Sequence, residues 1–395
     1  MYEPEKKQFI LKNSFGVSYH VFYEPSRGLC LRMLSDSYIW SRGFVLASHA
    51  VNDFAAALDN DDFLHFVFQS RDGSIMCGHG KHGQMEIQPI LNSRDTNPWP
   101  KYVSLLISGD TAVIFYKIRY SGRHLISMQT IRNGAVSKPL AIDYSDGSGP
   151  NYSAFVDNNE KCHIVYTIAG SSRMHLLYRQ LKDDFSLFNA PGTIYSTDGS
   201  IYFPSAAVDP DNKIHLLFQV NYDNHHEILY KNISSVKPVK TLYKGTAPPG
   251  FTGILHKSGT LYSFRVTGSG ILARSSGDGG KHWSGEMPVN FSGGELICFI
   301  YKTNFKKEKE IFFSSEIPGN FSHGYQLAFL NDDSQDISNI KDYINTPGWK
   351  YNIFSKSENK TTDRGRKISD IKNQGLSTDD IYIKKIEKKL LQLQS

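Results

Sequence analysis

The sequence predicts an all-β protein built from repeats of one four-stranded unit. A phrase made of a short strand, a polar turn and a second strand that ends near an aromatic residue recurs along the chain. Between copies lie two further stretches in which Ile, Leu, Val and Tyr alternate with polar residues. Four short strands per unit are typical of a propeller blade, which buries its two faces only by stacking on its neighbours. The predicted fold is therefore a β-propeller.

The phrase occurs seven times. Its clearest copies are residues 54–69, 152–167 and 203–219, and its weaker copies are residues 10–24, 103–117, 251–265 and 289–301. The residues at the end of the second strand are Tyr23, Phe68, Tyr116, Tyr166, Phe218, Phe264 and Ile300. Residues 8–330 divide into seven units of about 46 residues, the size of one blade. We expect a seven-bladed propeller in residues 1–330, with six blades as the alternative if the first or last copy is misread.

Composition excludes several other classes of protein. With 39% hydrophobic and 13% aromatic residues, the chain is too apolar for a disordered protein. The four cysteines, Cys30, Cys77, Cys162 and Cys298, lack the paired spacing of zinc or redox sites, so we expect buried thiols and neither a metal nor a cofactor. No apolar run approaches the ~18 residues of a membrane span, and the first residues show no apolar h-region, so we expect a cytoplasmic protein.

The net charge of +5 is not spread evenly along the chain. Residues 350–395 contain 11 Lys and Arg but only 6 Asp and Glu. Subtracting these from the totals of 44 and 39 leaves 33 of each sign in residues 1–349. The predicted propeller is therefore neutral and carries a short basic tail, which is where attraction to anionic partners is expected first.

A local motif in the sixth repeat fits the pattern S-x-D-x-G-x-x-W. Its residues are Ser276, Asp278, Gly280 and Trp283, and a degenerate copy spans residues 35–40. Asp278 is expected to accept backbone N–H groups in a tight turn, Gly280 to adopt a positive φ, and Trp283 to fill hydrophobic space beside the next strand. With its repeats, the chain resembles the BNR/Asp-box propellers, which include the sialidases.

That resemblance implies a fold more than an activity. Sialidases of this family are six-bladed, bind the substrate carboxylate with three arginines and use a Tyr/Glu pair with an Asp acid/base. Their [FY]RIP motif is absent, because the nearest string, residues 202–204, contains no arginine. The resemblance gives Asp278 a structural role, and we assign no catalytic residue.

Four histidines, His20, His65, His163 and His215, follow the polar turn in the second strand of their copies. Equivalent positions on different blades are spread around a ring, which argues against a shared metal site. We expect a repeated hydrogen bond between blades.

Strand order places the connections on two faces. Turns from the first to the second strand and from the third to the fourth lie on a first face; the other connections and the blade-to-blade loops lie on a second face. The first face carries acids: Asp59, Asp61, Asp62, Asp157, Glu160, Asp209 and Asp211. The second face carries bases: Arg27, Arg71, Arg119, Arg123, Arg173, Lys306, Lys307 and Lys309.

The second face is also rich in aromatic loop residues. Trp99, Tyr102, Tyr152 and Tyr202 are suited to stacking on sugar rings or bases, with Asn151 and arginines 27, 71, 119 and 173 as hydrogen-bonding groups. The alternative is that these rings only plug the starts of inner strands. Nearby acids dilute the positive charge, so nucleic acid is not the favoured ligand.

The composition changes after residue 330. Residues 331–354 predict a short helix and a connection, residues 355–376 a polar flexible linker, and residues 377–395 an amphipathic helix. The last helix places Ile383, Ile386, Leu390 and Leu393 at 3-4-3 spacing, which is too short for a stable coiled coil alone. We expect it to self-associate; docking to another protein, or to a membrane or acidic surface, are the alternatives.

The sequence thus favours a non-catalytic propeller that binds a glycan or protein on its loop face and oligomerises through its tail. One alternative is a carbohydrate-active enzyme, a sialidase-like glycoside hydrolase or a lyase, which would need two carboxylates close together in the centre. The other is a pure structural scaffold.

Overall fold

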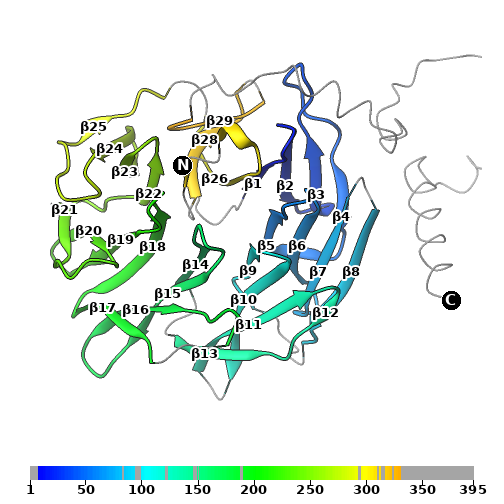
Figure 1. Ribbon diagram of the computed structural model, residues 1–395, viewed down its shortest axis with the longest axis horizontal. Coiled ribbons are helices and arrows are strands. Elements are labelled where there is room, and N and C mark those ends of the chain that lie inside the picture. Colours follow the sequence, from blue (N-terminus) through cyan, green and yellow to red (C-terminus); the bar gives the residue numbers. More distant parts are fainter. Residues whose placement is uncertain are drawn as a thin grey trace, which may run out of the picture. The chain divides into compact units, whose positions relative to one another are not determined.

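In the computed structural model, residues 8–330 are described except for 82–83, 94–98, 121–122, 146–148, 150, 187–189, 292–294, 309–310, 313–315 and 323. All of them belong to the first of two compact units, Met1–Trp349 and Lys350–Ser395. They form six β-sheets and one 3-10 turn, η1 (Lys306–Glu308). Figure 1 shows the sheets arranged around a common centre, with the first strand of each repeat innermost. The all-β prediction is confirmed, and the radial arrangement is that of a propeller.

Five sheets each start from one repeat, in chain order. The second repeat gives β5 (Ala50–Leu58), β6 (Leu64–Ser70), β7 (Ile75–Lys81) and β8 (Gln84–Leu91). The third gives β9 (Ser104–Ser108), β10 (Thr111–Tyr120), β11 (Arg123–Arg132), β12 (Ala135–Val136) and β13 (Leu140–Ser145). The fourth gives β14 (Tyr152–Val156), β15 (Cys162–Ala169), β16 (Met174–Gln180) and β17 (Gly192–Thr197). The fifth gives β18 (Ser200–Val208), β19 (Ile214–Asn221), β20 (His226–Asn232) and β21 (Lys240–Gly245). The sixth gives β22 (Phe251–Lys257), β23 (Thr260–Thr267), β24 (Gly270–Ser276) and β25 (Met287–Pro288), and β27 (Ile311–Phe312) joins it at the edge of β22.

The remaining sheet joins the first and last repeats. The first supplies β1 (Gln8–Lys12), β2 (Ser18–Glu24), β3 (Gly28–Met33) and β4 (Phe44–Ala47), and the last supplies β26 (Ile297–Thr303), β28 (Glu316–Asn320) and β29 (Gln326–Leu327). β1 pairs in parallel with β26, from Gln8 opposite Phe299 to Lys12 opposite Thr303. Seven repeats therefore occupy six sheets in the part of the chain that the structure describes, and seven separate blades are not shown.

The parallel pairing corrects the placement of the seventh copy. Its strand was expected to be the second of a blade, but β26 runs alongside the inner strand β1, as a first strand does. The loop that follows it consequently lies on the first face, where Asn304 Nδ2 donates to Asp59 O at 2.7 Å and to Asp62 Oδ1 at 2.8 Å. The exposed Lys306 and Lys307 come directly after it, so their assignment to the second face was wrong.

A buried ion pair lies where the first and last repeats meet. Lys12 Nζ on β1 is 2.7 Å from Glu308 Oε1, and the two side chains are only 6% and 3% exposed. Glu308 Oε2 accepts hydrogen bonds from the Tyr301 hydroxyl and, at 3.0 Å, from Thr303 Oγ1. A buried pair is tolerable because its remaining lone pairs are satisfied in this way.

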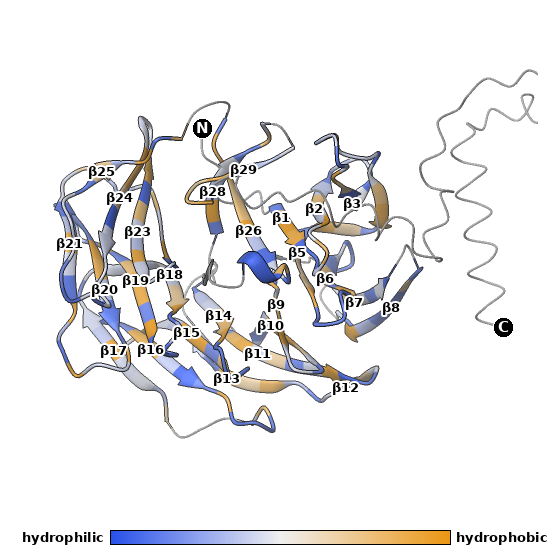
Figure 2. Cartoon of the chain, turned by 45° about the horizontal axis from the view of Figure 1, so that its top comes forward, coloured by the Kyte–Doolittle hydropathy of each residue, from blue (hydrophilic) through white to orange (hydrophobic). Residues whose placement is uncertain are grey.

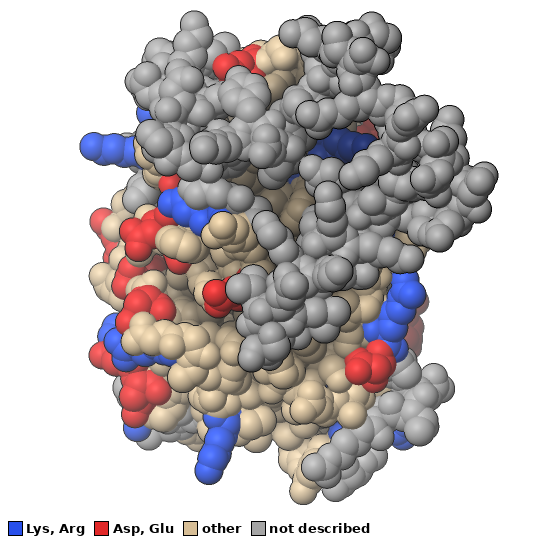
Figure 3. All heavy atoms as spheres, turned by 90° about the vertical axis from the view of Figure 1, so that its right-hand side faces the viewer, with Lys and Arg blue, Asp and Glu red and all other residues tan. Residues whose placement is uncertain are grey.

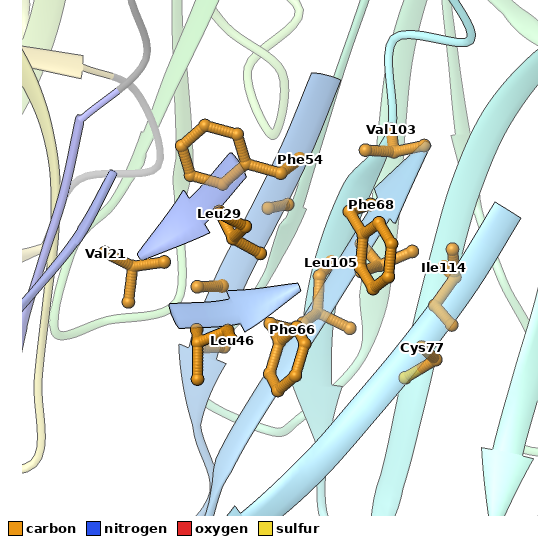
Figure 4. Packing of buried hydrophobic residues seen from close by; sticks show 14 of the residues in the cluster. Val21, Leu29, Leu46, Phe54, Phe66, Phe68, Cys77, Val103, Leu105 and Ile114 are labelled. Carbon is orange, nitrogen blue, oxygen red and sulfur yellow. The ribbon is translucent and has the colours of Figure 1, made fainter. Parts of the chain in front are cut away.

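The hydrophobic core consists of clusters between neighbouring sheets. The largest joins the first three repeats and includes Phe54, Phe66, Phe68 and Leu105, which interdigitate in Figure 4. Further clusters join the third to the fourth repeat, the fourth to the fifth, the fifth to the sixth, and the sixth to the sheet shared by the last and first repeats. Figure 2 shows the hydrophobic and hydrophilic bands that alternate along many strands. The four cysteines are buried free thiols, as predicted.

Polar side chains at the end of second strands hold the loop that enters the next sheet. Gln69 Nε2 donates to Trp99 O at 3.0 Å, Lys117 Nζ to Gly149 O at 2.8 Å, and Gln219 Nε2 to Gly250 O at 2.6 Å. Because all three side chains are at most 3% exposed, the loop carbonyls that they bind are satisfied without water. Each loop is thus fixed by the preceding repeat.

Three of the four second-strand histidines belong to one repeated turn. An aspartate six residues earlier places its Oδ2 next to the histidine Nε2: Asp59 to His65 at 2.8 Å, Asp157 to His163 at 3.1 Å and Asp209 to His215 at 3.1 Å. The Nδ1 atoms of the last two contact the hydroxyls of Tyr178 and Tyr230, each at 2.8 Å. These contacts lie within one sheet, so the expected bond between blades was wrong for the histidines themselves.

The aspartate of this turn also caps the backbone. Asp157 Oδ1 accepts the N–H groups of Asn159 and Lys161 at 2.9 and 2.8 Å, and Glu160 adopts a φ of 60°. The link to the next sheet is made by Asn212 Nδ2, which donates to Asp157 Oδ2 at 2.9 Å.

His20 is not equivalent to the other three. In the first repeat the turn begins at Asn13, and the residue six positions later is Tyr19. A shift of one residue sends a strand side chain to the opposite face of the sheet. His20 accordingly contacts Gln8 and Arg32 in place of an aspartate.

Breaking the buried ion pair should destabilise the fold. Lys12→Met leaves the Glu308 carboxylate buried without its partner, and we expect a loss of about 3–5 kcal/mol in unfolding free energy, measured by urea denaturation. The double variant Lys12→Met/Glu308→Gln should recover part of that loss. Lys213→Met, which breaks an exposed pair with Asp211, is the matched control and should cost far less. Equal losses in the two single variants would contradict the structural importance of the pair.

The histidine turns predict a stability that falls in mild acid. Burial lowers the pKa of His163 and of His215, although the neighbouring aspartates oppose the shift. An unfolded histidine titrates near about 6.5, so below that pH the unfolded chain binds protons that the folded chain does not. The two histidines therefore contribute fully to the free energy of unfolding above about pH 6.5. Their contribution decreases as the pH falls towards the lowered pKa values.

The dependence of stability on pH can be measured as the slope of the melting temperature between about pH 7.5 and about pH 5. We expect His215→Gln to have a lower melting temperature at neutral pH but a shallower slope than the wild type. His226→Gln, at the start of β20, is the control for losing an imidazole outside the turn. A slope identical in all three proteins would show that the turn histidines do not set it.

Candidate ligand-binding site

Four of the residues predicted to bind a ligand come together on the second face. Trp99 and Tyr102 precede β9, and Asn151 and Tyr152 lie at the start of β14 in the next sheet. The Tyr152 hydroxyl donates to Tyr102 O, which joins the two loops directly. Burial, followed by the charge of Asp53, raises the pKa of Tyr152 well above its usual value, so this hydroxyl remains a donor.

Asp53 fixes the first of these loops. Its carboxylate accepts three consecutive backbone N–H groups, from Lys101 at 2.6 Å, Tyr102 at 2.7 Å and Val103 at 3.0 Å. Asp53 lies in a bulged part of β5, since the pairing of β5 with β6 shifts between Ala50 and Phe54. Tyr102 adopts a φ of 53°, a conformation that the three bonds around it help to hold.

Two lysines lie at the base of this cluster. Lys117 on β10 is fully buried, and its Nζ donates to Gly149 O at 2.8 Å and to Asn151 Oδ1 at 3.1 Å while lying 5.6 Å from the centre of the Tyr102 ring. The Lys101 Nζ lies 5.2 Å from the centre of the Trp99 ring. The cluster therefore combines aromatic rings with cationic and amide hydrogen-bonding groups.

The Trp99 ring makes two contacts within the protein. Its ring centroid lies 4.6 Å from that of His124 on β11, and Lys101 lies over the ring as well. The interpretation of the loop aromatics as plugs therefore fits Trp99 better than a role in stacking on a ligand.

The other predicted residues are placed separately. Tyr202 lies in the bulged part of β18 and is 44% exposed. Arg71 and Arg173 are exposed at second-face turns, and Arg119 is exposed near the end of β10. Arg27 is partly buried and donates to Gly43 O at 2.5 Å, close to Glu24. The structure thus brings Trp99, Tyr102, Asn151 and Tyr152 into one cluster and leaves these five outside it.

Sequence reasoning missed Asp53, Lys117 and His124 as parts of this cluster. Lys117 did carry a signal, because it directly follows the end-of-strand residue Tyr116, at the position where Gln69 and Gln219 follow theirs. Asp53 had no such signal, because its partners are backbone groups of a loop about 50 residues away.

Among the residues that the structure describes, two acids adjoin the cluster, and both have structural partners. Asp53 is occupied by the three N–H groups. Asp143 Oδ2 accepts from the hydroxyl of Tyr166, the cross-strand partner of Tyr152, at 2.8 Å and lies 3.5 Å from Arg179 Nη2. Both carboxylates thus make structural contacts.

The motif of the sixth repeat forms a tight turn between β24 and β25. Asp278 Oδ1 accepts from Ser276 Oγ and from the His282 N–H, both at 2.9 Å, and Gly280 has a φ of 84°. The backbone bond of His282 and its side chain hold the pKa of Asp278 well below its usual value. The Trp283 ring packs edge-on against Tyr230 of the preceding sheet at 5.1 Å. These contacts make the motif a structural turn, while its membership of a family stays a prediction.

Some site classes are not represented in the described part of the chain. No group of three or more His, Cys, Asp or Glu side chains there is arranged to hold a metal ion. No helix among the same residues has the length and apolarity to cross a membrane.

On the flank shown in Figure 3, acidic and basic side chains lie side by side. Residues Ile383, Ile386, Leu390 and Leu393 of the expected oligomerisation helix lie outside the described residues.

Comparison with known proteins identifies no family. No family model and no curated protein matches the chain. Among solved structures it is similar to the Aleuria aurantia lectin in complex with Fucα1-6GlcNAc (9% identity, 74% of this chain and 98% of the lectin, TM-score 0.44). It is also similar to an ulvan lyase of polysaccharide lyase family 25 (8%, 79% and 89%, 0.47) and to AofleA from Arthrobotrys oligospora (11%, 84% and 96%, 0.39). Identities and TM-scores this low support no conclusion on family or function.

Proposed function

We propose that this chain is a non-catalytic binding module, a propeller of seven repeats that binds a glycan on its second face. The observation that supports this proposal is the convergence of Tyr102, Asn151, Tyr152 and the buried Lys117 from two neighbouring repeats. In this proposal the seventh repeat is reduced to β26, β28 and β29 and shares its sheet with the first.

The chemistry of the cluster suits a sugar. Aromatic rings offer flat apolar surface, and Tyr adds a polar hydroxyl at its edge. The amide of Asn151 supplies a hydrogen-bonding group for sugar hydroxyls, and such polar groups fix ligand orientation in otherwise apolar sites. The loops that carry them are anchored by Asp53 and Lys117, so little ordering is needed on binding.

Two exposed tyrosines of nearby repeats are the candidates for the stacking surface. Tyr120, at the end of β10, is 57% exposed, and Tyr202, on β18, is 44% exposed. They belong to the third and fifth repeats, on either side of the loop that carries Asn151 and Tyr152. We propose these two rings, rather than Trp99, as the ligand-stacking residues.

Among the described residues, the acids beside the cluster favour a binding role over hydrolysis. A glycosidase of the usual type needs two carboxyl groups flanking the scissile bond. Asp53 and Asp143 are instead engaged by backbone N–H groups and by Tyr166 and Arg179.

A glycan array with the full-length chain tests the proposal. We expect retention of at least one class of glycan, and Tyr202→Ala and Tyr120→Ala should each weaken it about five- to tenfold, since one ring contributes on the order of 1 kcal/mol. Phe63→Ala, on a first-face turn and 39% exposed, is the matched control and should bind as the wild type does.

An array on which the wild type binds nothing would contradict the glycan proposal and leave the protein-ligand and scaffold alternatives. Release of reducing sugar from a bound glycan would instead establish the alternative of a carbohydrate-active enzyme.

We further propose that residues 377–395 mediate self-association, on the basis of their apolar 3-4-3 spacing. Deleting residues 355–395 should lower the mass measured by light scattering and leave the thermal transition nearly unchanged. The full-length variant Ile386→Asp/Leu390→Asp should reproduce the lower mass, because it places charges on the apolar stripe. An unaltered mass in both proteins would refute self-association through this helix.

A further inference from the structure

A second polar site lies between the first and last repeats, away from the aromatic loops. Arg32 on β3 is partly buried, and its guanidinium carbon lies 4.8 Å from the Trp40 ring centre, 5.1 Å from that of Phe321 and 5.2 Å from that of Phe22. His20 completes this group, which we call the Arg32 cluster. Phe321 follows β28, so the cluster exists only because β26 and β28 share a sheet with β1 to β4 (Figure 1).

Among the described residues, the Arg32 guanidinium donates a hydrogen bond only through Nε. Arg32 Nε donates to His20 Nδ1 at 2.9 Å, and His20 Nε2 contacts Gln8 Oε1 at 2.6 Å. Burial and then the charge of Arg32 lower the pKa of His20 well below its usual value, so a neutral imidazole accepts from Nε. Within the described residues, neither Nη group has a hydrogen-bond partner and no carboxylate lies within 4.0 Å of the guanidinium.

Three other partly buried arginines, Arg27, Arg179 and Arg265, lie beside an acid, and Arg274 donates to a backbone carbonyl, Ser284 O, at 2.9 Å. Arg265 makes two bonds of 2.7 Å to Glu286, with a Tyr243 ring at 4.6 Å, and Arg179 lies 3.5 Å from Asp143. A partly buried cation without an acid is unfavourable, and the three rings offset only part of that cost. Burial alone lowers the pKa of Arg32, whereas the hydrogen bond to Glu286 raises the pKa of Arg265. Arg32 therefore has the charge and the unused donors that an anionic partner would complete.

The geometry points to a small oxyanion, namely a carboxylate, sulfate or phosphate group, bound end-on by the two Nη groups of Arg32. The guanidinium presents its Nη donors as a planar fork that matches two oxygens of such a group. The stacked rings fix the plane of the fork, and the bond to His20 fixes its rotation. Trp40 is itself held by a 2.9 Å bond from its Nε1 to Gly324 O. This site is independent of the proposed glycan site.

The test uses full-length protein labelled with 15N, titrated separately with sodium sulfate, phosphate and acetate against chloride at constant ionic strength. We expect the Arg32 Nε–H signal, assigned by its loss in Arg32→Lys, to shift saturably with at least one of the three oxyanions. The ion that binds most tightly then shows which of the three groups, carboxylate, sulfate or phosphate, the site prefers. The Arg265 signal should not shift, because Glu286 already occupies its fork.

Calorimetry with the preferred ion provides the affinity. Arg32→Lys keeps the charge but loses the planar fork, and we expect binding about tenfold weaker, while Arg265→Lys binds as the wild type does. If Arg32→Lys does not fold, Phe321→Leu assigns the signal, by displacing it through loss of the ring contact. Equal affinity in Arg32→Lys, parallel shifts at Arg32 and Arg265, or no saturable shift with any ion would each overturn the proposal.

Discussion

The parallel pairing of β1 with β26 is the contact on which the rest of the structure depends. It joins strands about 290 residues apart in the sequence and brings the ends of the row of repeats into one sheet. Each sheet buries its faces only against its neighbours, so without this pairing the first and last repeats would expose the apolar faces that now form their shared clusters. Lys302 adds a second tie, from β26 to Leu105 O on β9 at 2.9 Å, and its burial lowers its pKa to about 8.

Two repeated polar devices connect the repeats between these ends. On the first face, an aspartate caps the turn in three of the repeats and contacts a histidine six residues later. On the second face, Gln69, Lys117 and Gln219 bind the loop that enters the next sheet. The first device shapes a turn within a repeat, and the second fixes the position of the next repeat. The candidate ligand site lies where the second device uses a lysine in place of glutamine.

The strand order of the first six repeats could be predicted from the sequence because it depends on local signals. Alternating apolar residues and Asn- or Asp-rich turns lie within about 15 residues of each other, and strand order then assigns each loop to a face. This reasoning correctly placed the loops of Tyr102 and Tyr152 on the same face. It failed for β26, whose pattern is that of any apolar strand and whose neighbour is decided by distant pairing. It also failed for His20, since a difference of one residue in turn length is easily missed but reverses the side-chain direction.

The equal numbers of acidic and basic residues in residues 1–349 conceal how differently buried cations are held. Lys12 has a carboxylate, Lys117 has a backbone carbonyl and an amide oxygen, and Arg32 has aromatic rings and a neutral imidazole. The carboxylate neutralises the charge of Lys12. The partners of Lys117 and Arg32 stabilise a positive charge without neutralising it. Attraction between a neutral propeller and an anionic group is therefore decided at single positions, because long-range fields of balanced surface charges are screened within about 8–10 Å at physiological salt. A partly buried guanidinium with two unused Nη groups meets that requirement, and overall charge gives no indication of it.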